Sequence, residues 1–500
     1  MSASMAPPAA STSFLATRKG KLTLLLLCAV GFLDFVDATI VNIALPDIRK
    51  ALHFSTQNLQ WVLSGYLLTY GGFMLLGGRA GDLLGRRRVL VSGTVLFAVA
   101  SLTGGMAANA GELVGARLAQ GLGAAFMLPA ALSLLTTSFA EGQERNTALG
   151  VWGGVAGLAS AIGVFLGGVI TEGPGWRWVL FVNPLVAVAL LGAIFRLIPA
   201  DAPRVRTSRS GRFDVIGSVL VTAGMLLLVY ALVKAPNQGW GSARTIGELV
   251  VAAGLLLAFL LNEQRGSNPL IPLSTFRIPG LAAADATMLI AAAGLISMFF
   301  FLTLYMQNVL GYSPLQTGAA YLPFTAGVAV AAGISSQLMA KFGTRPFIVV
   351  GSLVAGGGIY MLSHLGTNGS YVSDLLPGLL VGSLGLGMMF VAVTTAANAG
   401  VPPSIAGLAA ALLNSSQQVG AALGLAIFSA VATARTNDLL AAHSSVPHAL
   451  TAGFQRALVA ESLFLVGAGL IGLRTKNAHD QELPPLPEPR PEAVEAVELT

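Results

Sequence analysis

The sequence has 500 residues, of which 54% are hydrophobic and only 10% are charged. Ordinary soluble domains carry roughly 25% charged residues, so this composition excludes a soluble globular protein. The 28 Lys and Arg residues outnumber the 22 Asp and Glu residues, but they are not concentrated in one polar segment, so we expect no nucleic-acid partner.

Apolar runs of about 20 residues, the length that crosses a bilayer, recur from Leu22 to Leu473. The first run is longer than the apolar region of a signal peptide and lacks a small-residue cleavage site, so we interpret it as a retained helix. The sequence therefore predicts an all-α polytopic membrane protein with fourteen transmembrane helices. The predicted spans are 22–45, 60–78, 89–108, 112–135, 146–171, 178–199, 214–234, 246–263, 281–304, 314–340, 346–364, 372–398, 405–432 and 454–473.

An even number of spans places both termini on one side of the membrane. Most Lys and Arg residues outside the spans fall on that side, including the runs Arg86–Arg88 and Arg204–Arg212. Cytoplasmic loops carry such an excess of basic residues. We therefore expect a multi-pass protein of the cell membrane with both termini in the cytoplasm.

An internal repeat relates the two ends of the chain. Gly85-Arg86-Arg87 matches Gly343-Thr344-Arg345, and Gly121-Leu122-Gly123 matches Gly385-Leu386-Gly387. Parallel repeats of this kind are typical of transporters. The predicted organisation is an N-terminal cytoplasmic segment, a six-helix bundle, a basic linker, an inserted transmembrane hairpin, a second six-helix bundle and a disordered cytoplasmic tail, at residues 1–21, 22–199, 200–213, 214–263, 281–473 and 474–500.

Charged residues inside the predicted spans are the strongest functional signal. Each costs about 2.5 to 3.5 kcal/mol in the bilayer, so each requires a partner or a task. Asp34 and Asp37 lie three residues apart on one face of the first helix, and Arg117 lies in the fourth. If these helices pack together, Arg117 can neutralise a carboxylate, and a proton arriving on the acid would release the pair. A static structural ion pair is the alternative.

Other polar residues interrupt the apolar spans. Asn414 and Gln418 share one face of the thirteenth helix, where they are suited either to line a polar cavity or to join helices. Asp285 lies near the start of the ninth helix and fits a functional or a capping role equally. The candidates for lining a substrate cavity are Asn42, Gln120, Asp285, Tyr305, Asn414, Gln417 and Gln418.

Several kinds of site are not indicated. The single cysteine, Cys28, allows no intrachain disulfide, and the five histidines show no metal-ligand spacing. No nucleotide-binding G-x-x-x-x-G-K-[ST] run is present in the sequence, which argues against an ATP-driven pump with its own nucleotide domain. We expect no cofactor and no metal, and therefore a gradient as the driving force.

Two segments resemble signatures of the major facilitator superfamily, specifically of its fourteen-helix drug/proton antiporter branch. Gly78 to Arg88 is similar to the loop between helices two and three, and Arg117 to Gly123 is similar to the motif of helix four. Asp37 to Pro46 resembles the first-helix motif of this branch. The resemblance covers nearly all of residues 22–473 and implies two six-helix bundles plus an inserted two-helix hairpin.

The resemblance also implies roles for residues at matching positions. Asp37, with Asp34 beside it, would be a coupling acid, and Arg117 would take part in proton transfer. The conformational gate would comprise Gly78, Asp82, Gly85, Arg86 and Arg87. Gly163, Gly167 and Gly168 would be the packing glycines of the antiporter motif, although Val164 stands where the branch has a proline.

The function predicted from these features is proton-coupled efflux of small hydrophobic or cationic compounds by a monomeric secondary transporter. A proton-coupled or facilitative solute permease and a lipid-type flippase of the same fold are alternatives, and Val164 keeps symport and uniport open. A membrane enzyme or receptor would need a catalytic cluster or a sizeable extramembrane domain, and the sequence contains neither.

Overall fold

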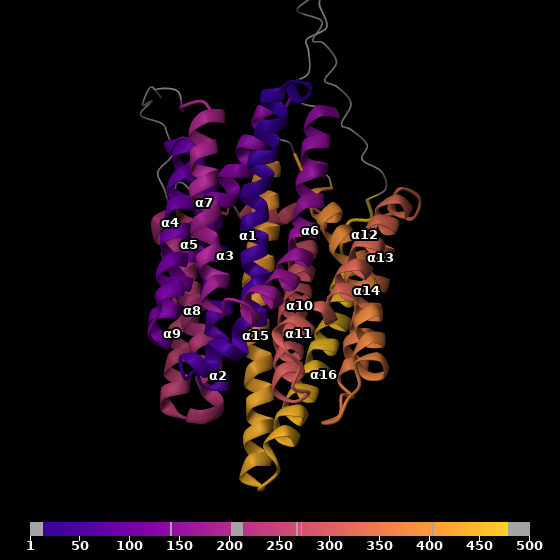
Figure 1. The fold of residues 1–500 in the computed structure, drawn as a ribbon. Helices are drawn as coiled ribbons and strands as arrows, with labels where there is room; N and C mark the ends of the chain where they lie inside the picture. Colours follow the sequence, from indigo (N-terminus) through magenta and orange to yellow (C-terminus); the bar gives the residue numbers. More distant parts are fainter. Residues whose placement is uncertain are drawn as a thin grey trace, which may run out of the picture.

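The computed structural model describes residues 14–140, 143–201, 214–266, 269–271, 273–399, 401–402 and 405–478, apart from some side chains within the helices. The long helices run roughly parallel to one another (Figure 1). A helix satisfies its own backbone amide and carbonyl groups, as the interior of a bilayer requires. The helices are α1 (Arg18–Ala51), α2 (Thr56–Leu59), α3 (Trp61–Leu84), α4 (Arg86–Met106), α5 (Ala110–Ser138), α6 (Gln143–Glu172), α7 (Arg177–Leu197), α8 (Val215–Gln238), α9 (Ala243–Arg265), α10 (Leu281–Asn308), α11 (Pro314–Ala320), α12 (Leu322–Phe342), α13 (Thr344–Leu362), α14 (Leu376–Asn398), α15 (Ala406–Ala441) and α16 (Val446–Gly472), with short turns η1 (Phe14–Ala16), η2 (Leu273–Arg277) and η3 (Tyr371–Leu375).

Among the described residues, 13 helices are long and apolar enough to cross a membrane. Helix α6 is 30 residues long and is not among these 13. Within the described residues, only its segment Ile162–Glu172 counts as an apolar helix, and this segment is shorter than a spanning helix. Large apolar side chains such as Val250 on α9 are exposed on the outside of the bundle, which suits a surface that faces lipid. The protein is therefore an all-helical multi-pass membrane protein, and 13 of the fourteen predicted spans meet this criterion within the described residues.

The observed helix ends differ from the predicted ones for local reasons. Helix α1 begins before residue 22 because the side chain of Thr17 accepts a hydrogen bond from the amide of Gly20 at 3.0 Å and caps the helix. The predicted span 314–340 is divided into α11 and α12 at Tyr321, since Pro323 in the first turn of α12 has no amide to continue a helix.

The ends of the predicted segments lie partly outside the described residues. This applies to residues 1–13 of the N-terminal segment, 202–213 of the linker and 479–500 of the tail. The described part of the predicted tail turns back onto the bundle, where the carbonyl of Ala478 accepts a hydrogen bond from the amide of Thr344 at 3.0 Å.

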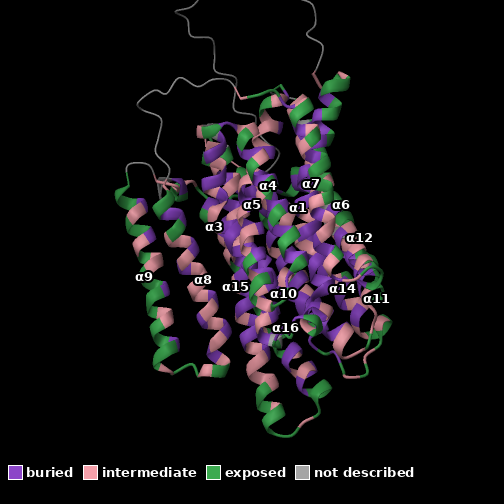
Figure 2. Cartoon of the chain, turned by 60° about the vertical axis from the view of Figure 1, so that its left-hand side comes forward, coloured by how far each residue is buried: buried purple, intermediate pink, exposed green. Residues whose placement is uncertain are grey.

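The two sets of helices related by the sequence repeat pack in the same way. In the first, α5 packs against α3 and α4, and α1 packs against α6 and α7. In the second, α14 packs against α12 and α13, and α10 packs against α15 and α16. The hairpin of α8 and α9 lies at the edge of the bundle, with α8 against α3 and α15 and with α9 largely exposed (Figure 2).

Matching N-caps begin one helix in each set, α4 and α13, on the side of the membrane that holds the chain termini. Gly85 and Gly343 precede α4 and α13 with φ values of 109° and 77°, a backbone conformation that favours glycine. The carboxylate of Asp201 accepts hydrogen bonds from the amides of Arg87 and Arg88 at 3.1 and 3.0 Å. The side chain of Asn477 accepts one from the amide of Arg345 at 2.9 Å.

Candidate functional site

Asp37 lies at the centre of a buried polar network in the first set of helices. Its side chain is fully buried and accepts three hydrogen bonds. They come from Arg117 Nη1 at 2.7 Å, Gln120 Nε2 at 2.9 Å and Asn183 Nδ2 at 2.5 Å. An ionised carboxylate only accepts hydrogen bonds, so three donors and a neighbouring cation suit a charged Asp37.

Arg117 is held from three directions. Its Nε donates to the carbonyl oxygen of Val62 at 2.9 Å, and its Nη1 also lies 2.8 Å from Gln120 Oε1. The guanidinium carbon lies 4.3 Å from the centroid of the Tyr66 ring, within the range of a cation–π interaction. These contacts fix the guanidinium on α5 between α1 and α3, and its Nη2 has no hydrogen-bond partner among the described residues.

Asp34 has different partners, although it lies one turn from Asp37. The hydroxyl of Tyr66 donates to its Oδ1 at 2.7 Å, and the hydroxyl of Tyr70 donates to its Oδ2 at 2.9 Å. Asp34 is buried and has no ion-pair partner within the described residues. The two acids on α1 are thus distinct sites, one paired with a cation and one held by phenols.

Asn183 extends the network to α7 and α4. Besides Asp37, its Nδ2 donates to Ser101 Oγ at 2.9 Å, and Ser101 Oγ donates to the carbonyl oxygen of Leu180 at 2.9 Å. Helices α1, α5 and α7 therefore meet at one carboxylate, and α3 and α4 join the network through Arg117 and Asn183. A buried network of this kind is favourable when its donors and acceptors are matched, and it fixes the relative positions of the helices.

Sequence reasoning missed four members of this network. Tyr66 and Tyr70 were detectable as polar-tipped aromatics one turn apart on α3, and Asn183 as an isolated amide in the apolar α7. Ser101 carries no comparable signal, because serine is common within membrane helices and often bonds its own backbone.

The remaining cavity candidates lie apart from this network. Asp285 is buried on α10, and neither of its carboxyl oxygens has a hydrogen-bond partner among the described residues. The hydroxyl of Tyr305 donates to the carbonyl oxygen of Gly366 at 2.5 Å. Asn42 is buried, and its Oδ1 has no hydrogen-bond partner in the part of the chain that the structure describes.

The polar stretch of α15 lies at a contact with α3. Asn414 Nδ2 donates to the carbonyl oxygen of Ala410 in its own helix at 2.9 Å, and Gln417 and Gln418 are partly exposed. A Cβ atom on Gly71 of α3 would lie 3.0 Å from Gln418 Cβ. This stretch therefore contributes to the junction between the two sets of helices.

The predicted gate segment forms the end of α3 and the start of α4. The side chain of Asp82 lies outside the part of the chain that the structure describes. Arg87 Nη2 donates to the carbonyl oxygen of Phe195 at 3.3 Å, and Arg86 is the first residue of α4. A Cβ atom on Gly78 would make ordinary contacts, whereas one on Gly85 would lie 2.4 Å from the carboxylate of Asp201.

The three predicted packing glycines of α6 lie at close helix contacts. A Cβ atom on Gly163 would lie 2.1 Å from Thr39 Oγ1, and one on Gly167 would lie 2.7 Å from the carbonyl oxygen of Ile40. A Cβ atom on Gly168 would lie 2.7 Å from the carbonyl oxygen of Pro314. Helix α6 therefore lies directly on α1 and α11 without the proline that Val164 replaces.

The two sets of helices also meet on the membrane side opposite the chain termini. Glu172 Oε2 accepts a hydrogen bond from the amide of Leu315 at 3.0 Å, at the junction of α6 and α11. Gln307 Nε2 on α10 donates to the carbonyl oxygen of Ile43 on α1 at 3.0 Å. These contacts join the two sets of helices on that side.

Comparisons with solved structures agree on the fold. The structure matches a bacterial homolog of the human lysosomal transporter Spinster, in an inward-facing and occupied conformation, with a TM-score of 0.67 at 16% identity over 91% of this chain and 97% of that one. It also matches a D-xylose-proton symporter with a TM-score of 0.63 at 14% identity over 92% of this chain and 99% of that one. At these identities the likeness establishes the architecture alone.

Comparisons of sequence extend further. The puromycin resistance protein pur8 of Streptomyces alboniger is 40% identical over 90% of this chain and 89% of its own length. The cephamycin export protein CmcT of Amycolatopsis lactamdurans is 35% identical over 91% and 92%. The tetracenomycin C resistance and export protein of Streptomyces glaucescens is 37% identical over 83% and 76%. The family model of the Major Facilitator Superfamily matches residues 27–425, and this chain is a member of that family of membrane transporters.

Proposed function

We propose that this protein exports small hydrophobic or cationic compounds in exchange for protons, as a monomer working by alternating access. The buried pair of Asp37 and Arg117, 2.7 Å apart, is the observation that carries the proton coupling. The names of the relatives support export, since they describe resistance to or export of antibiotics. Both termini lie in the cytoplasm in this proposal, because most basic residues outside the spans lie on their side.

The coupling step follows from the geometry. When a proton neutralises Asp37, the attraction to Arg117 falls, and a neutral acid no longer matches three donors. Helices α1, α5 and α7 then lose the interaction that holds them together, so their packing can change. Deprotonation on the other side of the membrane restores the pair and resets the transporter.

The energy of the proton gradient is sufficient for uphill export. One proton moving inward yields about 2.3 kcal/mol per 100 mV of membrane potential, in addition to the contribution of the pH difference. Compounds would bind near the midplane between the two sets of helices, where transporters of this kind hold their substrates. No cofactor takes part in this scheme.

The test is transport of a fluorescent cationic dye in proteoliposomes with an imposed pH gradient. We expect Asp37→Asn to abolish dye transport driven by the gradient, while Asp47→Asn, on the same helix but partly exposed, leaves it intact. Unchanged transport by a correctly inserted Asp37→Asn protein would exclude Asp37 as the coupling acid. Dye movement in the same direction as the protons would indicate a symporter instead.

A further inference from the structure

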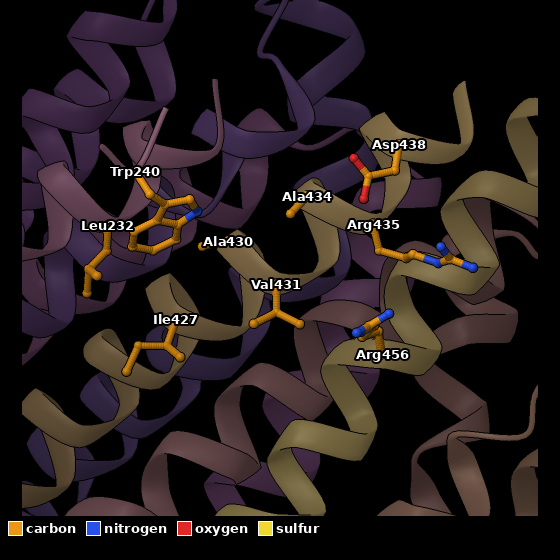
Figure 3. Close-up of a pocket in the computed structure, with 9 residues that line it drawn as sticks. All are labelled: Leu232, Trp240, Ile427, Ala430, Val431, Ala434, Arg435, Asp438 and Arg456. Atoms are coloured by element: carbon orange, nitrogen blue, oxygen red, sulfur yellow. The ribbon is translucent and has the colours of Figure 1, made fainter. Parts of the chain in front are cut away.

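A second feature lies far from the Asp37 network, between the inserted hairpin and the second set of helices. A pocket of about 340 Å³ is bounded by the end of α8, by α15 and by α16 (Figure 3). Its lining residues are Leu232, Trp240, Ile427, Ala430, Val431, Ala434, Arg435, Asp438 and Arg456. It lies on the membrane side opposite the chain termini, because it is formed where α8 and α15 end and α16 begins.

The lining changes from apolar to charged along one face of α15. Ile427, Val431, Ala434 and Asp438 follow at helical spacing, and Arg435 lies beside the last two. The apolar residues come from the middle of the helix and the charged residues from near its end. A phospholipid has the same order along the membrane normal, with acyl chains toward the midplane and the headgroup at the surface.

The charges of the pocket have no partners within the described protein. The side chains of Arg435 on α15 and Arg456 on α16 form no hydrogen bond or ion pair with described residues, and neither does the carboxylate of Asp438. Figure 3 shows the two arginines on one side of the pocket and Trp240 with Leu232 on the other. Two free guanidinium groups beside a free carboxylate complement a ligand with a phosphate and a nearby cation.

We propose that this pocket binds one phospholipid whose headgroup carries both a phosphate and a primary ammonium, namely phosphatidylethanolamine. Arg435 and Arg456 bind the phosphate, since guanidinium groups match its oxygens. Asp438 accepts hydrogen bonds from the ammonium. Leu232, Ile427 and Val431 contact the first part of an acyl chain, and Trp240 lies at the interface, where tryptophan is favoured.

Fluorescence quenching by brominated lipids tests this proposal with the full-length protein in liposomes. The emission of Trp240 is obtained by subtracting the emission of the Trp240→Phe protein from that of the wild type. The other tryptophans remain in place in both proteins. We compare acyl-brominated phosphatidylethanolamine, phosphatidylcholine and phosphatidylglycerol at equal mole fractions. Lipids that merely surround the protein quench Trp240 equally, whereas a bound lipid does so at lower mole fraction.

We expect phosphatidylethanolamine to quench Trp240 at an about tenfold lower mole fraction than the other two lipids, the effect of one charge-assisted hydrogen bond. The double variant Arg435→Gln/Arg456→Gln removes this preference. Asp438→Asn removes the preference over both lipids, because the ammonium loses its charged acceptor. Arg49→Gln is the control, because it removes a positive charge on the same side of the membrane but outside this pocket. We expect this variant to keep the preference over both lipids. Equal quenching by all three lipids, or stronger quenching by phosphatidylglycerol, would overturn the proposal.

Discussion

Tyr66 connects the two acids of α1, because its hydroxyl lies 2.7 Å from Asp34 Oδ1 while its ring lies 4.3 Å from the guanidinium carbon of Arg117, the partner of Asp37. A change in the protonation of either acid therefore alters the surroundings of the same aromatic side chain. Tyr66 lies on α3, which also contacts α15 of the other set of helices. The network is thus joined to the junction between the two sets of helices, which would move in the proposed transport cycle.

The two contacts of Tyr66 can be separated by substitution. Tyr66→Phe removes the hydrogen bond to Asp34 and keeps the ring beside Arg117, so we expect a loss of about 1 kcal/mol of stability. Tyr66→Leu removes both contacts and leaves a cavity where the ring packed, so we expect it to cost at least about 1 kcal/mol more. Thermal unfolding in detergent measures the difference, and dye transport shows which contact serves coupling. Equal stability of the two variants would show that the cation–π contact contributes nothing.

The buried ion pair predicts a strongly non-additive pair of variants. Arg117→Met leaves Asp37 charged and unpaired in an apolar bundle, which costs about 3 to 5 kcal/mol. Adding Asp37→Leu removes the uncompensated charge, so we expect the double variant to regain most of that stability. It should still fail to couple transport to protons. A double variant that couples normally would contradict the proposed role of the pair, whatever its stability.

Sequence alone was sufficient to predict the helical architecture. In a bilayer the backbone polar groups have to form hydrogen bonds within the protein, so a long apolar run forms a helix. The sequence also predicted that Arg117 would neutralise a carboxylate of the first helix if the two helices packed together, since two opposite charges in apolar spans need each other. The partition of the acids was not predictable. Asp34 and Asp37 have the same spacing and chemistry, and only the packing of α3 and α7 gives them different partners.

Helix breaks and pockets between helices were less predictable for a related reason. Pro323 divides a predicted span, whereas Pro46, Pro129 and Pro184 lie inside continuous helices. Proline within a membrane helix is tolerated where neighbouring groups satisfy the freed carbonyl, and this depends on packing. The lining of the pocket at Arg435 and Arg456 combines three helices that sequence does not place together.

The contact between α6 and α1 can be tested at Gly163. Gly163→Ala places a methyl group 2.1 Å from Thr39 Oγ1 and 3.0 Å from the carbonyl oxygen of Val36, so we expect a loss of about 1 to 3 kcal/mol of stability from overpacking. Gly192→Ala on α7 is the matched control, because a Cβ atom there would meet no atom within 4 Å. Thermal unfolding compares the two proteins. If both variants unfold at the same temperature, the two helices are not in close contact.

The contact between α6 and α11 predicts a cross-link that stops transport. A Cβ atom on Gly318 would lie 3.5 Å from the Cα atom of Phe165, so the two backbones approach closely at this pair of positions. In a Cys28→Ala background, we expect Phe165→Cys/Gly318→Cys to lose dye transport under mild oxidation and to regain it after reduction. Either cysteine alone should be insensitive to the oxidant. Transport that continues in a fully cross-linked protein would mean that α6 and α11 stay together throughout the cycle, and that closure on the side opposite the termini is not a step of alternating access.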